Sequence, residues 1–334
     1  MEFGPVPTAA AQGAVLAHSV MAGGRKMAKG RVLTCEDLSL LRSEGIATVV
    51  VARLGPGDVG EDQAAARLAA AMVPNAAAAG LTVTVPHTGR VNFHAAGPGV
   101  LEVDAGRVMA LNRIDPSITF ATLQPLTRVE KGTLAGTVKI ISYAVAEAAL
   151  TQAEEVARGA VRLRPVVLRS AGLVLTDAPG QAEKLNDKGR RAIAQRLKAL
   201  GMALAEVRVV PHETTAIRDA LAGIGGEMVL ILTGAATSDL HDDGPEAVRA
   251  AGGQVARFGM PVDPGNLLFY GSLGVRPVIG LPGCARSPAL NGADWVLERL
   301  ACGIAVTDED IAAMGVGGLL KEIPIRPQPR DAQD

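Results

Sequence analysis

The chain has few aromatic side chains and almost no net charge. Aromatic residues make up 2% of its 334 positions, and the formal net charge at pH 7 is −1. Proteins that bind nucleic acid rely on a basic surface, and many of them stack bases on aromatic side chains. The composition supplies neither feature, so we expect no nucleic-acid partner. Local basic groups remain available for a phosphorylated small molecule.

Cysteine is equally scarce. The three cysteines, Cys35, Cys284 and Cys302, are far apart in the sequence, odd in number and without CxxC spacing. This pattern argues against both a disulfide framework and a zinc site. Reduced thiols are typical of the cytoplasm, and we therefore expect a cytoplasmic protein.

Long apolar runs without charge are nearly absent as well. The N-terminus lacks the cationic start and the apolar core of a signal peptide. Residues 68–85 carry no charge, but Pro74, Asn75 and Gly80 interrupt them, and alanine is their commonest residue. We therefore predict a surface helix, a loop and a strand in this stretch, and no membrane segment.

The first 160 residues combine helical patterns with a period of two. Thr34 precedes two acidic residues, which predicts an N-cap and a helix that ends at Gly45. A strand is predicted at residues 47–52, an alanine-rich helix up to about residue 73, and a further helix at residues 146–160. Between them the pattern predicts short strands at residues 81–85, 91–94, 100–103, 107–111, 118–120 and 137–141. We interpret residues 1–160 as a β-rich α+β accessory region with helices.

From residue 166 onward, predicted strands alternate with predicted helices. The strands are at residues 166–176, 204–210, 228–232, 255–258, 267–270 and 278–280, and the helices at residues 186–200, 213–221, 244–251 and 287–300. This alternation is typical of a three-layer α/β/α domain with a mostly parallel sheet, which we assign to residues 161–305. Residues 306–334 end in a proline-rich, charged stretch and are predicted to form a C-terminal tail.

Three turns that contain glycine lie next to predicted strands of this second half. Residues 233–245 run from small residues through hydroxyls to carboxylates, and residues 263–266 and 280–287 contain Pro-Gly turns. Ligands of open α/β sheets bind just outside the carboxyl ends of the strands. We therefore expect the three turns to form a single pocket.

The first of these turns offers groups that suit a phosphate and a cation. Its small residues expose backbone N–H groups, and Thr233, Thr237 and Ser238 add hydroxyl donors. Asp239, Asp242 and Asp243 could hold Mg²⁺, which binds carboxylates together with substrate phosphates, and of the three we favour Asp239 and Asp242. The alternative is an ordinary turn in which Asp242 and Asp243 only cap the next helix.

The third turn ends in Arg286 and Ser287, just before a predicted helix. A guanidinium at this place suits bidentate binding of a phosphate. The alternative is an arginine that pairs with a nearby acid at the surface. Both interpretations remain open from the sequence.

In order and approximate spacing, the three turns resemble the molybdopterin-binding domain shared by molybdopterin molybdenumtransferases and molybdopterin adenylyltransferases. Residues 232–242 are similar to the family's strand, T-G-G loop, serine and aspartate pair, residues 263–266 to its K-P-G-K-P turn, and residues 280–287 to its G-L-P-G-N-P-x-S turn. The resemblance implies catalytic and Mg²⁺-binding roles for Asp239 and Asp242. It implies that molybdopterin is bound by Thr233, Gly234, Ala235, Ala236, Thr237, Ser238, Pro264, Gly265, Asn266, Pro282, Gly283, Arg286 and Ser287.

The chain departs from the family pattern at four of these positions. Ala235 replaces the second glycine of the first motif, which restricts the approach of the backbone to a phosphate. Asp263 and Asn266 stand where the family has two lysines, and Cys284 stands where it has asparagine. The site therefore has two cations fewer for an anionic ligand.

The resemblance implies a protein of molybdenum cofactor biosynthesis that binds a small pterin phosphate. One function that it implies is the insertion of molybdate into adenylated molybdopterin, with Mg²⁺. More closely, the whole chain resembles the molybdopterin-binding half of proteins that carry a nucleotidyltransferase domain after it. The alternative is therefore a non-catalytic module that presents the cofactor to a nucleotidyltransferase partner. Related enzymes build their sites at dimer interfaces, so we expect a homodimer.

Overall fold

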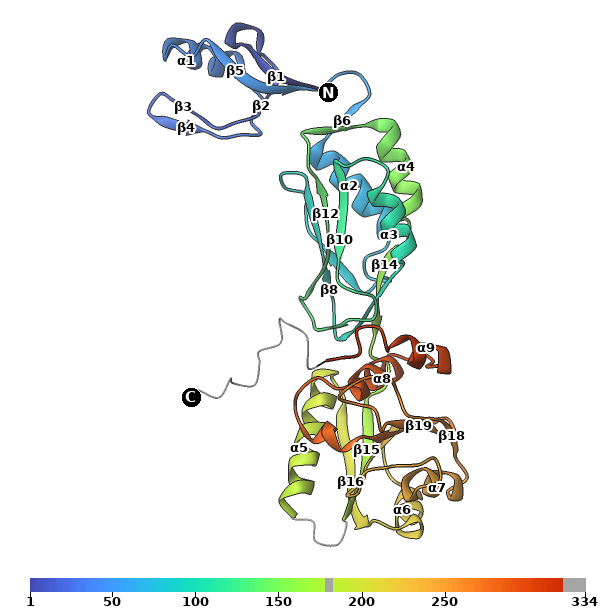
Figure 1. Ribbon diagram of the computed structural model, residues 1–334. Helices are drawn as coiled ribbons and strands as arrows, with labels where there is room; N and C mark the ends of the chain where they lie inside the picture. The colour runs from blue at the N-terminus through green and yellow to red at the C-terminus, as the bar shows by residue number, and fades with distance from the viewer. Residues whose placement is uncertain (178–182, 321–334) are drawn as a thin grey trace. The chain divides into compact units, whose positions relative to one another are not determined.

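The computed structural model describes residues 1–177 and 183–320, and it divides the chain into two compact units (Figure 1). The first unit comprises Met1–Gly97 and Leu101–Arg164, and the second comprises Pro98–Val100 and Pro165–Asp334. Each unit has its own buried apolar core. In the described part of the chain, no helix is both long enough and apolar enough to cross a membrane.

The first unit begins with a small antiparallel sheet. Strand β5 (Thr48–Arg53) pairs with β1 (Glu2–Pro7) on one side and β2 (Val15–Leu16) on the other. Helix α1 (Cys35–Ser43) packs beside a core to which it contributes Leu38 and Leu41. The predicted helix after Thr34 and the predicted strand at residues 47–52 are thus both confirmed. A hairpin of β3 (Val20–Ala22) and β4 (Arg25–Met27) adjoins them.

Helix α1 begins with a capping box that contains an ion pair. The Thr34 hydroxyl accepts a hydrogen bond from the Asp37 N–H at 3.3 Å, and Asp37 Oδ2 accepts one from the Thr34 N–H at 3.0 Å. The guanidinium of Arg31 binds both oxygens of Asp37, at 2.8 and 2.9 Å. These hydrogen bonds, first that from Arg31 and then those from Thr34, hold the pKa of the buried Asp37 below its ordinary value despite its burial.

We predict that the backbone amides of helix α1 lose their protection against hydrogen exchange in acid. A carboxyl group with a lowered folded-state pKa stabilises the fold above its unfolded pKa of about 4, and that stability is lost as the pH falls through the lower, folded-state pKa. Amide hydrogen exchange on the whole chain should show α1 opening below about pH 4. Asp37→Asn should already open more easily at pH 7 and should respond less to acid. Equal acid sensitivity of the two proteins would contradict this role of Asp37.

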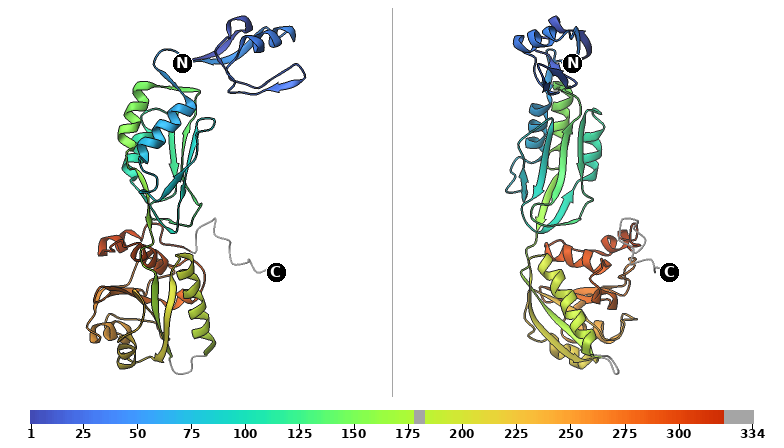
Figure 2. Two further views of the ribbon diagram at one scale, coloured as in Figure 1. Left: turned by 180° about the vertical axis from the view of Figure 1, so that it is seen from behind. Right: turned by 90° about the vertical axis from the view of Figure 1, so that its left-hand side faces the viewer.

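The rest of the first unit is a layer of helices against antiparallel sheets (Figure 2). Helix α2 (Glu61–Met72) packs against α4 (Glu147–Ala157) and on the four-stranded sheet of order β10-β12-β8-β7. This sheet and a smaller one of order β11-β9-β14 are formed by β7 (Leu81–Val83), β8 (Arg90–Ala95), β9 (Gly99–Val103), β10 (Ile118–Thr122), β11 (Arg128–Val129), β12 (Leu134–Ile140) and β14 (Val161–Pro165). A short pair, β6 (Asp58–Gly60) with β13 (Ala144–Ala146), completes the unit.

One predicted strand of this region is wrong. Residues 107–111 belong to helix α3 (Ala105–Asn112). Asp104 caps this helix, because its Oδ1 accepts a hydrogen bond from the Arg107 N–H at 3.0 Å. The local sequence fits either a two-residue or a helical period, and the aspartate cap decides between them.

The second unit is a three-layer α/β/α domain, as the sequence predicts. Its sheet is formed by β15 (Ser170–Asp177), β16 (Ala203–Pro211), β17 (Met228–Leu232), β18 (Gln254–Phe258), β19 (Phe269–Leu273) and β20 (Arg276–Leu281). The strand order is β16-β15-β17-β20-β19-β18, and the first four strands are parallel. Strand β19 is antiparallel to both of its neighbours. This mostly parallel sheet confirms the predicted fold class.

Helices cover both faces of this sheet. Alternate residues of β17 face opposite ways: Leu230 and Leu232 join the core beneath α5 (Glu183–Ala199) and α8 (Gly292–Ala301), whereas Ile231 joins the core beneath α6 (Thr214–Leu221) and α7 (Asp243–Ala250). Because β17 is buried on both faces, every one of its residues is apolar, and this explains the continuous apolar run at residues 228–232. A short helix, α9 (Asp308–Ala313), contributes Ile311 to the α5 side.

The last predicted helix begins later than expected. Residues 283–286 form a short 3-10 helix, η2 (Gly283–Arg286), and α8 begins only at Gly292. Pro288 disfavours the helical conformation of the residue before it, and Asn291 forms a capping box with Asp294. Residues 287–291 therefore remain a non-helical connection.

Candidate functional site

The three turns singled out in the sequence lie at the carboxyl end of the parallel strands. We define the first loop as residues 233–242, the second as residues 259–268 and the third as residues 282–291. The first follows β17 and the third follows β20, while the second leads into β19, whose first residue pairs with Gly280 near the end of β20. The chain runs from β15 to β16 on one side and then to β17 on the other, so the strand order reverses here. Ligands of open α/β sheets bind at such a point.

Arg286 joins the third loop to the first. Its side chain lies in the interior, with 7% of the residue exposed, and its Nη2 donates a hydrogen bond to the Thr233 carbonyl at 2.8 Å. Two glycines lie beside this side chain, since a Cβ on Gly283 would be in van der Waals contact with Nη1, at 3.4 Å, and one on Gly189 would be in contact with Cγ, at 3.6 Å. The surface-pair interpretation is excluded by this burial.

Among the described residues, no acidic side chain pairs with the guanidinium of Arg286. Its Nε is buried without a hydrogen-bond partner, and no carboxylate of the described ranges forms an ion pair with it. Burial alone lowers the pKa of Arg286. A buried ion without a partner is costly, and an anionic ligand nearby would reduce that cost.

The first loop is held by hydrogen bonds at both of its ends. The Gly234 N–H donates to Thr176 Oγ1 at 2.6 Å, and the Ser238 N–H donates to Asp242 Oδ2 at 2.9 Å. Thr237 is buried between these anchors, and Thr233 is buried at the start of the loop. Ala235 and Ala236 are exposed, so they form the surface of the loop.

Asp242 caps helix α7. One of its oxygens accepts from the Ser238 N–H and the other from the Asp243 N–H, both at 2.9 Å. The exposed Asp239 instead accepts a hydrogen bond from the His241 N–H at 2.8 Å. His241, also exposed, pairs with Glu246 at 2.9 Å. The capping contacts proposed for Asp242 from the sequence are therefore present.

The carboxylate of Asp243 connects α7 to α6. Its Oδ1 accepts hydrogen bonds from the Thr214 N–H at 2.9 Å and from the Thr214 hydroxyl at 2.5 Å, and its Oδ2 lies 3.8 Å from His212 Nε2. The other ring nitrogen of His212 is 2.9 Å from Thr176 Oγ1. The ligand atoms of His212, Asp242 and Asp243 lie within 4.8 Å of one another.

These groups partly fit a divalent cation. Asp242 and Asp243 offer the oxygen ligands that Mg²⁺ prefers, whereas an imidazole nitrogen is a better ligand for a transition metal. Asp243 is the other carboxylate of this group, and Asp239 does not belong to it.

The second loop supports the start of α8. The peptide bond between Asp263 and Pro264 is cis, and the Pro264 carbonyl accepts a hydrogen bond from the Gly292 N–H at 2.8 Å. Gly265 has a φ of 145°, and a Cβ there would lie 2.9 Å from the Gly292 nitrogen. Pro264 and Gly265 are buried by this packing, while Asn266 is exposed.

The third loop has both buried and accessible residues. Pro282 is buried and its carbonyl accepts from the Ala285 N–H at 2.8 Å, while Gly283 and Cys284 are exposed. The Ser287 hydroxyl accepts a hydrogen bond from the Ala289 N–H at 3.3 Å. The structure thus brings the first and third loops together through Arg286, and the second and third loops together at the start of α8.

A cavity of about 560 Å³ opens at the same end of the sheet. It is lined by the ends of β15 and β16 and the first turns of α5: Leu175, Asp177, Asn186, Asp187, Arg190, Val207 and Val209.

The sequence interpretation missed residues that hold the site in place. Thr176 anchors the first loop, and Arg196, on α5, binds the third loop. His212 was given no role. A Thr-Asp pair at the end of the first buried strand and a His-Glu pair at the end of the next were visible signals, because strand ends converge at one edge. Nothing in the local sequence marks Arg196.

We predict different effects for two substitutions of Asp242. Asp242→Ala removes both hydrogen bonds that the carboxylate accepts from backbone N–H groups and should cost about 1–2 kcal/mol of unfolding free energy, whereas Asp242→Asn keeps one acceptor oxygen and should cost about half of that. Urea unfolding followed by the fluorescence of Trp295, which lies on α8 in the same unit, measures both. Equal losses would show that the negative charge, rather than the cap, provides the stability.

Two parts of the chain match known protein families. Residues 166–301 match the model of a family described as a probable molybdopterin binding domain. Residues 5–53 match a domain of unknown function. No curated protein matches the chain. The first match covers the sheet and all three loops of the second unit.

Several solved structures are similar to the chain at low identity. The molybdopterin biosynthesis moea protein from Pyrococcus horikosii is 13% identical, with 90% of this chain and 76% of that chain covered and a TM-score of 0.31. A molybdenum cofactor biosynthesis protein B is 18% identical over 39% and 86%, with a TM-score of 0.27. A molybdenum cofactor biosynthesis protein from Pyrococcus furiosus is 13% identical over 93% and 65%, with a TM-score of 0.23. At these TM-scores the likenesses do not bear on function.

Proposed function

We propose that the second unit binds molybdopterin and acts in molybdenum cofactor biosynthesis, with the phosphate of the pterin held at the first and third loops. The observation that carries this proposal is the buried guanidinium of Arg286, whose charge has no carboxylate partner in the described ranges. The match of residues 166–301 to a probable molybdopterin binding domain supports the choice of ligand.

The first loop supplies the rest of the phosphate site. The exposed residues Ala235 and Ala236 lie between two anchored N–H groups, those of Gly234 and Ser238. Backbone N–H groups in such a loop bind phosphate oxygens without a charged side chain. This arrangement compensates in part for the lysines that the second loop lacks.

The proposal has a catalytic form, in which the protein inserts molybdate into adenylated molybdopterin. Asp242 and Asp239 remain the proposed ligands of Mg²⁺, and Asp243, the third candidate carboxylate, lies close to Asp242. Bound Mg²⁺ would neutralise charge on the phosphate oxygens of the substrate. In this form, the protein itself orients the phosphate by Arg286 and the first loop.

The second form is a non-catalytic module that presents molybdopterin to a nucleotidyltransferase. The engagement of both Asp242 oxygens with backbone N–H groups favours this form, because a structural cap explains the residue without a metal. The absence of lysine at positions 263 and 266 points the same way. Both forms need the same phosphate site.

Anaerobic titration with molybdopterin, followed by a turnover assay, tests the proposal. The purified protein is titrated first, and then receives adenylated molybdopterin, molybdate and Mg²⁺ while AMP release is followed. Release that requires molybdate, and that is lost in Asp242→Asn, establishes the catalytic form, because this variant lacks the charge but keeps one of the two capping hydrogen bonds. Binding without release establishes the presenting module. The absence of molybdopterin binding would refute both forms.

A further inference from the structure

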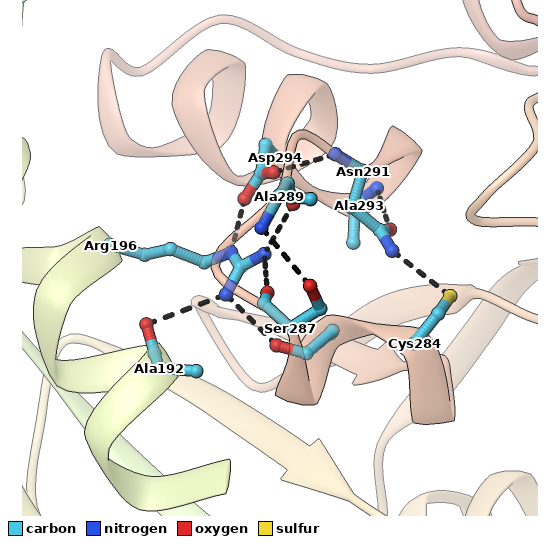
Figure 3. A network of polar contacts seen from close by, with 9 residues as sticks. Ala192, Arg196, Cys284, Ser287, Ala289, Asn291, Ala293 and Asp294 are labelled. Carbon is cyan, nitrogen blue, oxygen red and sulfur yellow. Dashed lines mark hydrogen bonds and ion pairs between the residues drawn. The ribbon is translucent and has the colours of Figure 1, made fainter. Parts of the chain in front are cut away.

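We propose that Arg196 is the positioning residue of the third loop, and that it acts on the ligand through Arg286. The inference rests on the proposed function, since it concerns the loop that carries the phosphate-binding arginine. Arg196 lies on α5, far from the third loop in sequence, yet its guanidinium lies against the inner side of that loop (Figure 3).

The guanidinium of Arg196 donates hydrogen bonds to three backbone carbonyl groups of the third loop. Its Nη1 donates to the Ala285 carbonyl at 2.9 Å, and its Nη2 donates to the Ser287 and Ala289 carbonyls at 2.8 and 3.1 Å. Carbonyls that point at α5 cannot face the bound anion. Arg196 thus fixes the path of the chain on both sides of Arg286, and it also removes negative dipoles from the ligand side.

An ion pair ties the same guanidinium to the start of α8. Arg196 Nε binds Asp294, and both side chains are 11% exposed. The other oxygen of Asp294 accepts a hydrogen bond from the Asn291 N–H at 2.8 Å, and Asn291 Nδ2 donates to Cys284 Sγ at 3.0 Å. These hydrogen bonds and this ion pair therefore contact the third loop along its length, from Cys284 in its first turn to Asn291 at its end (Figure 3).

Lysine cannot replace Arg196 in this role. A planar guanidinium presents donors in a fixed fork, whereas an ammonium group is a single point with three donors. Arg196→Lys therefore retains a charge for Asp294 but cannot reach three separate carbonyls together. The substitution separates the ion pair from the positioning of the loop.

The chain contains a matched control for this change. Arg208 also combines a carboxylate, Glu206, with three backbone carbonyls, those of Ala220, Ala222 and Gly223. These carbonyls belong to the end of α6 and the turn after it, away from the third loop. Arg208→Lys breaks an equivalent set of contacts without touching the site.

The thiol of Cys284 reports on the third loop in the absence of any ligand. It is exposed, Cys302 is buried, and the exposed Cys35 can be removed by Cys35→Ser. In that background we expect Ellman's reagent to react several-fold faster with Arg196→Lys, because the loss of hydrogen bonds to the loop carbonyls loosens the loop around the thiol and its contact with Asn291. Arg208→Lys should react at the unmodified rate. Equal rates for all three proteins, or an equal increase in both variants, would overturn the inference.

Ligand binding shows whether Arg196 acts through Arg286. Arg196→Lys should weaken molybdopterin binding about tenfold, and should weaken it no further when Arg286→Met is already present, since coupled residues are not additive. Additive losses would overturn the role through Arg286. If the unmodified protein binds no molybdopterin, the proposed function fails, but the thiol rates still decide whether Arg196 positions the loop.

Discussion

Replacing Arg286 with methionine is expected to make the ligand-free protein more stable and to weaken phosphate binding. Methionine can follow the path of the arginine side chain between Gly189 and Gly283 without carrying a charge into the interior. The loss of the hydrogen bond to Thr233 costs about 1 kcal/mol. The removal of an unpaired buried charge gains more, so we expect a net stabilisation of about 1–3 kcal/mol.

The same substitution should reduce the affinity for molybdopterin by about 1.5–3 kcal/mol, the usual contribution of a hydrogen bond to a charged group. Urea unfolding, followed by Trp295 fluorescence, measures the stability, and anaerobic titration measures the affinity. Opposite signs in the two measurements would show that Arg286 is maintained for binding at the expense of stability.

Arg299→Met is the matched control for stability. Burial also lowers the pKa of Arg299, but Asp310 and Glu298 act on this guanidinium in the opposite direction. Removing Arg299 takes away its attraction to these carboxylates, so Arg299→Met should destabilise the protein. If Arg286→Met destabilises it to the same extent, Arg286 has a counter-charge of its own, and the argument for an anionic ligand is lost.

The sequence predicted most of the fold of the second unit because its signals are local. The run at residues 228–232 is apolar throughout, as burial on both faces requires, and the alternation of strands and helices restricts the topology. The failures are also local. At residues 107–111 two periodicities overlap, and at residues 287–291 a proline and an asparagine cap delay the helix.

The site was less predictable, because its contacts join distant parts of the chain. The sequence singled out Arg286 but could not show that it is buried, since its side chain packs against residues distant in sequence, among them Thr233 and Gly189. It left Asp242 as either a cap or a ligand, and the structure shows the cap contacts without testing the ligand role. Thr176 and Arg196 act on loops 58 and 89 positions away; the end of a buried strand marks Thr176, but nothing in the local sequence marks Arg196.

Gly280 shows how tightly the strand that leads into the third loop is packed. It pairs with Phe269 on β19, and a Cβ at Gly280 would lie 1.9 Å from Cε1 of that ring and 2.3 Å from Cζ. Phe269 is 1% exposed. Gly244 also lies next to its ring, because a Cβ on Gly244 would be 3.1 Å from Cε1 of Phe269. The ring of Phe269 therefore occupies the space that two glycines leave open, between β20 and the start of α7.

Gly280→Ala is expected to destabilise the second unit by about 3 kcal/mol or more. Added methyl groups in close-packed cores typically cost about 1–3 kcal/mol, and here the ring has no free space into which it can move. Urea unfolding followed by Trp295 fluorescence measures the loss. Gly225→Ala is the control, because the nearest atom to its added Cβ is the end of the Glu206 side chain at 3.4 Å, and it should cost less than about 1 kcal/mol.

A second substitution tests whether the ring is the cause. Phe269→Leu removes the edge of the ring that the new methyl group meets, so the double variant Gly280→Ala/Phe269→Leu should be more stable than the sum of the two single losses allows. Additive losses would place the strain elsewhere in β20. Because β20 continues directly into Pro282 and the third loop, a displaced ring should also shift Arg286. Gly280→Ala should therefore lower molybdopterin affinity at urea concentrations where the unit is still folded, whereas Gly225→Ala should not.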